Sequence, residues 1–179
     1  MIKVIHILGA AGSGTTTLGK ELENIYKFTH LDVDDYFWLP TNPPFTTKRV
    51  IEERIELLEK DILNTDKCVV TGSLCIWGDR FIPYFDLVIE IETPTEVRID
   101  RIKKREYKRF GSRILENGDM FQGHQEFLEW AKGYDTGDVN MRSKALHDLW
   151  LKKLGCKKVI IDGTKPLEET IRLLNKIIK

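Results

Sequence analysis

The stretch that decides the fold is Ile5-His-Ile-Leu-Gly-Ala-Ala-Gly-Ser-Gly-Thr-Thr-Thr17. Gly9 and Gly14 have the spacing of the motif G-x-x-x-x-G-K-[ST], although Thr15 stands where the motif has lysine. An apolar run precedes the glycines and a helix-like amphipathic pattern follows them, so the stretch predicts a strand, a loop and a helix. Glycines allow successive N–H groups to turn toward an anion at the positive end of the helix. We therefore expect a phosphate-binding loop; the alternative is a plain glycine-rich turn.

The hydroxyl of Thr16 has the position that binds Mg²⁺ in this motif. The residues expected to hold phosphate groups share this one loop, and they are Gly9, Ala11, Gly12, Ser13, Gly14, Thr15, Thr16 and Thr17.

The composition is that of one soluble domain. The chain has 179 residues, 41% of them hydrophobic, and its 28 Lys and Arg balance its 28 Asp and Glu, so we expect no nucleic-acid or membrane partner. No apolar run approaches the roughly 20 residues of a membrane span, and no signal-peptide pattern begins the chain, which predicts a cytoplasmic protein. The three cysteines lack the spacing of a disulfide framework or a zinc site, and the four histidines show no metal spacing. We expect a monomer or a homodimer.

Strands and helices alternate along the chain. Strand patterns occur at residues 2–8, 29–33, 67–71, 86–92 and 157–161, and helical patterns at residues 16–28, 47–63, 95–109, 121–130, 142–154 and 166–178. This order predicts an α/β fold in which helices cover both faces of a five-stranded parallel sheet. A glycine-rich segment at 110–138 predicts a mobile element over the site.

Acidic residues follow the second predicted strand. Because ligands bind outside the carboxyl ends of parallel strands, Asp32 and Asp34 are expected to face the phosphate loop. A carboxylate there can accept the proton of an attacking hydroxyl, and Asp34 is the first candidate for this role. The alternative for each aspartate is that it caps the local turn.

Aromatic and basic residues come next. Tyr36 and Phe37 are predicted to line an acceptor pocket, although they also fit a small hydrophobic cluster under a flap at about residues 34–64. Arg54 is expected to bind an acceptor phosphate or carboxylate, unless it forms ordinary surface ion pairs. Gly72 and Ser73 end the third strand, where glycine permits close approach of a ligand, or simply a turn.

Four arginines recur at helical spacing and share one predicted face: Arg98, Arg101, Arg105 and Arg109. Arginine suits phosphate oxygens, so we expect this face to clamp a nucleotide; the alternative is a solvated helix face.

Taken in order, these segments resemble the P-loop nucleoside and nucleotide kinases of the adenylate kinase-like and shikimate kinase-like branch. The resemblance rests on the phosphate loop, on Leu-Asp32-Val-Asp34-Asp35, on Gly72-Ser73, on Asp100-Arg101-Ile-Lys-Lys-Arg105 and on Ile161-Asp-Gly163-Thr-Lys165-Pro166. It implies a three-layer P-loop NTPase fold, a single domain over residues 1–179 and a helical lid at about 105–138. It also implies that Arg101 packs on adenine and Arg105 contacts phosphates, both as members of the catalytic site, and that the loop with Gly163 and Lys165 edges the adenine ring.

The resemblance implies an ATP- and Mg²⁺-dependent kinase that phosphorylates a nucleoside, a nucleotide or a similar small acceptor. Thr15 departs from the family pattern, because the usual lysine bridges the β- and γ-phosphates. Arg105, Arg109 or Lys20 are the candidates to compensate. The alternative function is a nucleotide-binding protein with weak or no kinase activity.

Overall fold

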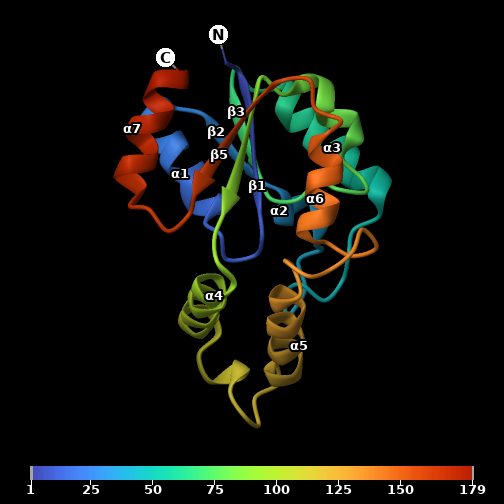
Figure 1. Cartoon of the computed structure of the whole chain (residues 1–179). Coiled ribbons are helices and arrows are strands. Elements are labelled where there is room, and N and C mark those ends of the chain that lie inside the picture. Colours follow the sequence, from blue (N-terminus) through green and yellow to red (C-terminus); the bar gives the residue numbers. More distant parts are fainter. Residues whose placement is uncertain (1, 179) are drawn as a thin grey trace.

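The computed structural model describes residues 2–178 and has one parallel sheet of five strands in the order β2-β3-β1-β4-β5 (Figure 1). Every pairing in the sheet is parallel. The strands are β1 (Val4–Gly9), β2 (Thr29–Asp32), β3 (Cys68–Thr71), β4 (Leu87–Glu92) and β5 (Lys157–Asp162). The five strands expected from the sequence are confirmed, and so is the α/β class.

Helices cover both faces of the sheet and also extend beyond it. The helices are α1 (Thr15–Tyr26), α2 (Val33–Phe37), α3 (Ile51–Leu63), α4 (Thr95–Phe110), α5 (Phe121–Lys132), α6 (Lys144–Leu151) and α7 (Leu167–Ile178), with short 3-10 turns η1 (Asp79–Tyr84) and η2 (Gly111–Ile114). Helices α1 and α7 lie on one face of the sheet, whereas α3 and α6 lie on the other (Figure 1). The three-layer arrangement predicted from the sequence is therefore present.

Alternation along the central strand builds the two halves of the core. Ile5 and Ile7 of β1 belong to the hydrophobic cluster that includes residues of α1 and α7, whereas Leu8 belongs to the cluster that includes residues of α3 and α6. Side chains of a strand point alternately to its two faces, so apolar residues at successive positions serve both layers. Ile5 and Ile7 are completely buried, which explains why β1 reads as a nearly continuous apolar run.

The chain between β4 and α6 includes residues 105–138, which the resemblance predicts to be a lid, and we call it the lid. Helices α4 and α5 project past the carboxyl ends of the strands (Figure 1) and pack on each other through the small cluster of Ile99, Ile102, Leu128 and Ala131. The predicted glycine-rich segment at 110–138 thus contains η2 and most of the lid. Its first part touches the flap, because the Arg113 guanidinium donates to Asn42 Oδ1 at 3.2 Å.

Most boundaries differ from the expected ones by one to three residues, and two differences around the flap are larger. A short helix, α2, follows β2 directly, and the flap helix begins at Ile51 rather than near residue 47. Residues 38–48 instead form an antiparallel turn in which Leu39 N–H donates to the Thr47 carbonyl at 2.9 Å. The helical spacing predicted a helix from residue 47, but it could not show that residues 47–49 pair with residues 37–39 instead.

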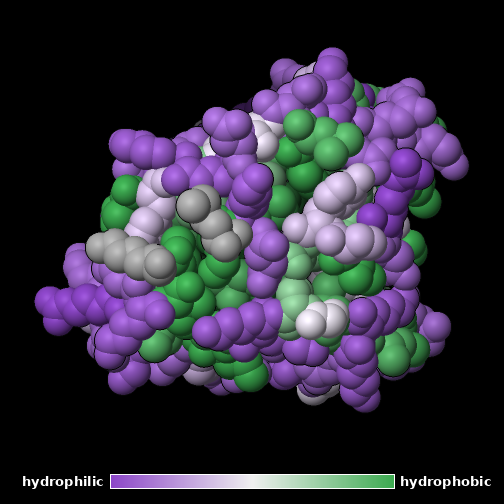
Figure 2. Space-filling model, turned by 90° about the horizontal axis from the view of Figure 1, so that it is seen from above, coloured by the Kyte–Doolittle hydropathy of each residue, from purple (hydrophilic) through white to green (hydrophobic). Residues whose placement is uncertain are grey.

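The face of the molecule opposite the lid shows hydrophilic side chains with apolar ones between them (Figure 2). Within residues 2–178, no helix has the length and apolar character needed to cross a membrane.

Candidate active site

The phosphate loop joins β1 to α1 and presents an open side. Gly12 and Gly14 have φ values of 81° and 109°, which L side chains rarely adopt. Gly14 precedes α1 without any side-chain cap, and no acidic residue occupies the first turn of that helix. A Cβ atom at Gly14 would meet no atom within 4 Å. The first amides of α1 are therefore free of side-chain partners beside open space, as an anion site requires.

The other side of the loop is packed against the sheet. A Cβ atom at Gly9 would lie 2.5 Å from Ser13 Oγ and 2.7 Å from the Ile91 carbonyl oxygen. Ser13 is buried and its N–H donates to the Ala10 carbonyl at 3.0 Å. Gly9 and the Ser13 side chain therefore shape the loop from behind rather than facing its open side, whereas Thr15 begins α1 and Thr17 is exposed.

Thr16 and Asp32 form an oxygen pair at the mouth of the loop. Thr16 Oγ1 donates to Asp32 Oδ2 at 3.0 Å, and Asp32 Oδ1 accepts from the Asp34 amide at 3.1 Å. Asp32 is thus the residue that caps α2, so the capping alternative applies to Asp32 and leaves the Asp34 carboxylate free. In the described part of the chain, no group of three His, Cys, Asp or Glu side chains could hold a metal ion by itself.

Asp34 follows the carboxyl end of β2, at the edge of the sheet from which α4 and α5 project (Figure 1), and we call this edge the crevice because ligands of parallel sheets bind there. Solvent reaches this carboxylate, yet the surrounding protein displaces enough water to raise its pKa, and the Asp32 carboxylate raises the pKa further. The positive charges of Arg142 and Arg105 act in the opposite direction. Asp34 is therefore a carboxylate of raised pKa on which the charges of two arginines act.

Arg142 is the functional candidate that the sequence reasoning missed. It precedes Ser143, the cap of α6, and its guanidinium lies over the Trp130 ring at 4.6 Å. Burial lowers its pKa, and the Asp34 charge opposes this shift. Among residues 2–178 it donates no side-chain hydrogen bond, so its fork is free for a ligand. The only sequence signal was a single arginine directly before a helix cap.

The arginines of α4 contact different parts of the protein. Arg101 donates to the Gly163 carbonyl at 2.9 Å and to the Ser13 carbonyl at 3.4 Å, and Arg105 donates to Glu106 Oε1 at 3.0 Å. Arg109 lies 4.9 Å from the Phe45 ring. The expectation that Arg98 shares a clamp with them is wrong, because Arg98 is fully buried and donates to the carbonyls of Thr93 and Ala131.

The loop after β5 packs against the back of the phosphate loop. The Gly163 N–H donates to the Glu92 carbonyl at 2.7 Å, and a Cβ atom at Gly163 would collide with Thr93 Oγ1 and lie 3.0 Å from the Ser13 carbonyl oxygen. Gly163 therefore permits a close approach of two backbone segments. Lys165 is exposed in the turn that follows.

The residues predicted to line the acceptor pocket pack against other protein groups. Tyr36 is buried in the core and donates to Asp61 Oδ2 at 2.7 Å, so its predicted place on a pocket wall is wrong. Phe37 is half-buried with the Arg54 guanidinium 3.9 Å from its ring centre, and Arg54 donates to the Arg49 carbonyl at 2.7 Å. One face of Phe37 is therefore already covered by a cation.

Gly72 and Ser73 meet protein groups where a ligand was expected. Gly72 has φ 117°, and a Cβ atom there would lie 2.8 Å from Val33 Cβ, so its close approach is to α2. Ser73 Oγ lies 3.0 Å from His147 Nε2 in a buried contact. Both residues therefore contact protein groups inside the molecule, and neither contact indicates a ligand.

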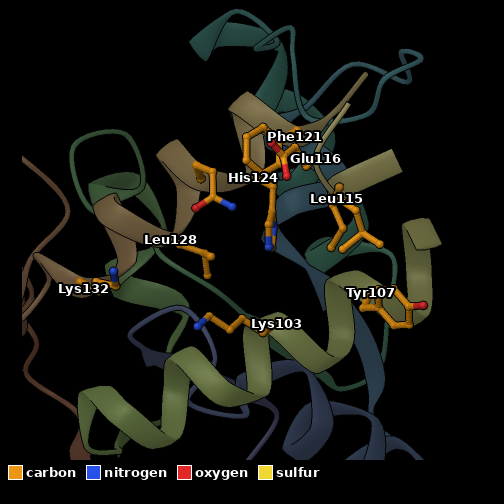
Figure 3. Close-up of a pocket in the computed structure, with 10 residues that line it drawn as sticks. Lys103, Tyr107, Leu115, Glu116, Phe121, His124, Leu128 and Lys132 are labelled. Atoms are coloured by element: carbon orange, nitrogen blue, oxygen red, sulfur yellow. The ribbon is translucent and has the colours of Figure 1, made fainter. Parts of the chain in front are cut away.

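A cavity of about 400 Å³ lies between α4 and α5 (Figure 3). Lys103 and Tyr107 of α4 and His124 and Leu128 of α5 line it, and none of the predicted site residues does. A second cavity of about 590 Å³ lies beside β4 and β5, where Glu90, Glu92 and Lys144 contribute to its wall. The candidate site is therefore defined by the phosphate loop and the crevice rather than by either cavity.

Comparisons with known proteins identify the family of the chain. The sequence model of the AAA domain family matches residues 5–122. The uncharacterized protein YqaC of Bacillus subtilis (strain 168) is 42% identical over 171 residues, which cover 96% of this chain and 94% of that protein. A cytidylate kinase of Thermococcus sibiricus (strain DSM 12597 / MM 739) is 29% identical over 156 residues, covering 82% of this chain and 77% of that protein.

Solved structures give the same fold. The shikimate kinase from Bacteroides thetaiotaomicron has a TM-score of 0.55 and 16% identity, with 99% of each chain covered. The chain therefore belongs to the AAA domain family, and its fold is that of the P-loop kinases.

Proposed function

We propose that this protein is an ATP- and Mg²⁺-dependent kinase that transfers the γ-phosphoryl group to a nucleoside, a nucleotide or a similar small acceptor. The observation that carries this proposal is the position of Asp34. The charges of Arg105 and Arg142 act on its carboxylate. Asp34 also lies two residues after Asp32, which ends β2, caps the helix that carries Asp34 and accepts from Thr16. A potential base, two cations and an anion loop thus meet at one edge of the sheet.

The oxygen pair of Thr16 and Asp32 fits a magnesium ion. Mg²⁺ binds through one or two protein oxygens together with phosphate oxygens and water, so a hydroxyl and a carboxylate oxygen 3.0 Å apart are a suitable protein contribution. When bound, the ion would offset negative charge on the phosphates. The fit does not need the three-residue cluster that a metal site built only from protein would have.

Asp34 is placed to serve as the base for the acceptor hydroxyl. Its pKa is raised toward neutral pH, and a carboxylate with a higher pKa is a better proton acceptor as long as it stays ionised. The charges of Arg142 and Arg105, which act on Asp34, would stabilise the negative charge that increases during transfer. Because their guanidinium groups also attract anions, we expect the acceptor to carry a phosphate or a carboxylate.

The relative named above sets the order of the acceptor panel. The Thermococcus sibiricus protein is a cytidylate kinase, so cytidine nucleotides come first, followed by other nucleosides, nucleotides and small hydroxy acids. Single-turnover assays with Mg·ATP would measure ADP release with and without each compound. A kinase gives acceptor-stimulated ADP release and a phosphorylated product. ATP binding without stimulation by any compound supports the alternative, a nucleotide-binding protein without kinase activity.

A further inference from the structure

A buried chain of polar side chains runs behind the crevice. Ser73 Oγ lies 3.0 Å from His147 Nε2, and the Tyr134 hydroxyl lies 2.8 Å from His147 Nδ1. Ser73 follows β3, Tyr134 follows α5, and His147 belongs to α6. Their exposed fractions are 8%, 6% and 0%, so solvent does not compete for these contacts.

His147, the middle residue of this row of three polar side chains, is neutral at pH 7. Burial and the nearby Arg142 charge lower its pKa to about 3. A neutral imidazole has one N–H donor and one acceptor nitrogen, and the hydroxyls at its two ends can each donate or accept. Whichever tautomer is present, the ring therefore satisfies both Ser73 and Tyr134 at once and links two segments that are far apart in the sequence.

One end of this chain belongs to the base of the lid. The Arg98 guanidinium lies 5.3 Å from the Tyr134 ring centre, and Arg98 also donates to the carbonyls of Thr93 and Ala131. Thr93 precedes α4 and Ala131 lies near the end of α5. Tyr134 is thus attached to the point where both lid helices meet the body.

The other end belongs to the acceptor side. Ser73 follows Gly72, which packs directly against Val33 at the start of the helix that carries Asp34. The Arg142 charge acts on both His147 and Asp34. A shift at either end of the chain would therefore reach groups that face the crevice.

We infer that His147 is a positioning residue that couples the base of the lid to the acceptor side of the crevice. Its neutral ring holds Tyr134 and Ser73 together, so the lid base and the segment after β3 become ordered as one unit. This inference rests on the proposed function only for its consequence in turnover, because the coupling is a property of the protein without ligands.

Amide hydrogen exchange of the free protein tests the coupling directly. Tyr134→Phe removes the hydroxyl at the lid end while keeping the ring. If the chain couples its ends, exchange at residues 72–78 rises about tenfold as well as exchange at residues 131–136. The reciprocal variant Ser73→Ala should raise exchange at residues 131–136. The matched control is Tyr84→Phe, which removes the tyrosine hydroxyl that donates to Glu59 at 3.0 Å elsewhere.

A change confined to residues 131–136 in Tyr134→Phe, and to residues 72–78 in Ser73→Ala, would overturn the inference and leave only local packing. A second readout concerns turnover. With an acceptor identified, Tyr134→Phe should raise the acceptor KM about tenfold with little change in the ATP KM, whereas simple loss of folded protein lowers kcat alone. Absence of turnover in all proteins would contradict the proposed function, while the exchange result would still decide the coupling.

Discussion

Replacing Asp34 by Asn is the sharpest test of the candidate site. Asp34 contributes its backbone N–H to the Asp32 cap, and Asn preserves that contact because only the side chain changes. The carboxylate itself has no hydrogen-bond partner among the described side chains, so the substitution removes little packing or bonding. Loss of a general base lowers kcat by about 10²- to 10⁴-fold, which corresponds to about 2.7–5.4 kcal/mol in the transition state.

Although Asp34→Asn is expected to lower kcat, it is not expected to lower the free energy of unfolding. The pKa of Asp34 is raised in the folded protein, so the folded state binds more protons than the unfolded state. Stability therefore falls as pH rises from the ordinary carboxyl value of 3.8 through the raised value. At pH 7 the charged carboxylate opposes folding, and Asp34→Asn should have an equal or higher free energy of unfolding.

Three measurements on one protein separate the possible roles: kcat with the identified acceptor, ATP affinity by calorimetry and urea unfolding at pH 7. We expect reduced kcat, unchanged ATP affinity and no loss of stability. Asp35→Asn is the matched control, because Asp35 is the exposed neighbour on the same short helix. Normal kcat in Asp34→Asn would refute the base assignment, and lower stability would indicate a structural role instead.

Three further predictions follow from the loop and the core. Gly14→Ala should lower ATP affinity more than tenfold and the free energy of unfolding by about 1–3 kcal/mol, because a φ of 109° strains any residue with a side chain. Gly111→Ala is the control for strain alone, because Gly111 has φ 57° and its Cβ position also lies in open space. Thr15→Lys should tighten ATP binding and lessen the loss caused by Arg105→Ala, and measured affinities that show neither effect contradict compensation by Arg105. Burial lowers the pKa of His6 to about 4, so the unfolded state binds a proton more readily than the folded state between pH 6.5 and pH 4. His6 should therefore lower the free energy of unfolding by about 1.4 kcal/mol for each pH unit below 6.5. Urea unfolding of His6→Gln at several pH values should lack that contribution.

The sheet and most helices could be predicted because their patterns are local. Buried parallel strands read as short apolar runs, and Ile5 and Ile7 show such a run in β1. Helix α2 could not be predicted in the same way, since five residues hold too little periodicity for a helical pattern. It forms because Asp32 caps it and Val33 and Tyr36 face the core.

The site could be predicted only where its residues are close in sequence. The phosphate loop and the aspartates after β2 belong to single continuous segments, so motif spacing identified them. Arg142 and the chain through His147 depend on which segments the fold brings together, and no spacing between them carries that information. Position 72 is a second example: a Cβ atom there would collide with Val33, so the close approach that requires glycine is to a distant protein segment and not to a ligand.

The arginines of α4 show why a shared helical face does not imply a shared ligand. Positions three and four apart do lie on one face, but each residue also advances about 1.5 Å along the axis, so Arg98 and Arg109 are separated by about 16 Å. Over that length the helix passes different neighbours: the lid base at Arg98, the phosphate loop at Arg101 and the flap residue Phe45 at Arg109. If the loop after β1 binds phosphates as proposed, only the middle of this helix face is close enough to contact them. Charge for the far side of the crevice must come from another segment, and Arg142 has that position beside Asp34.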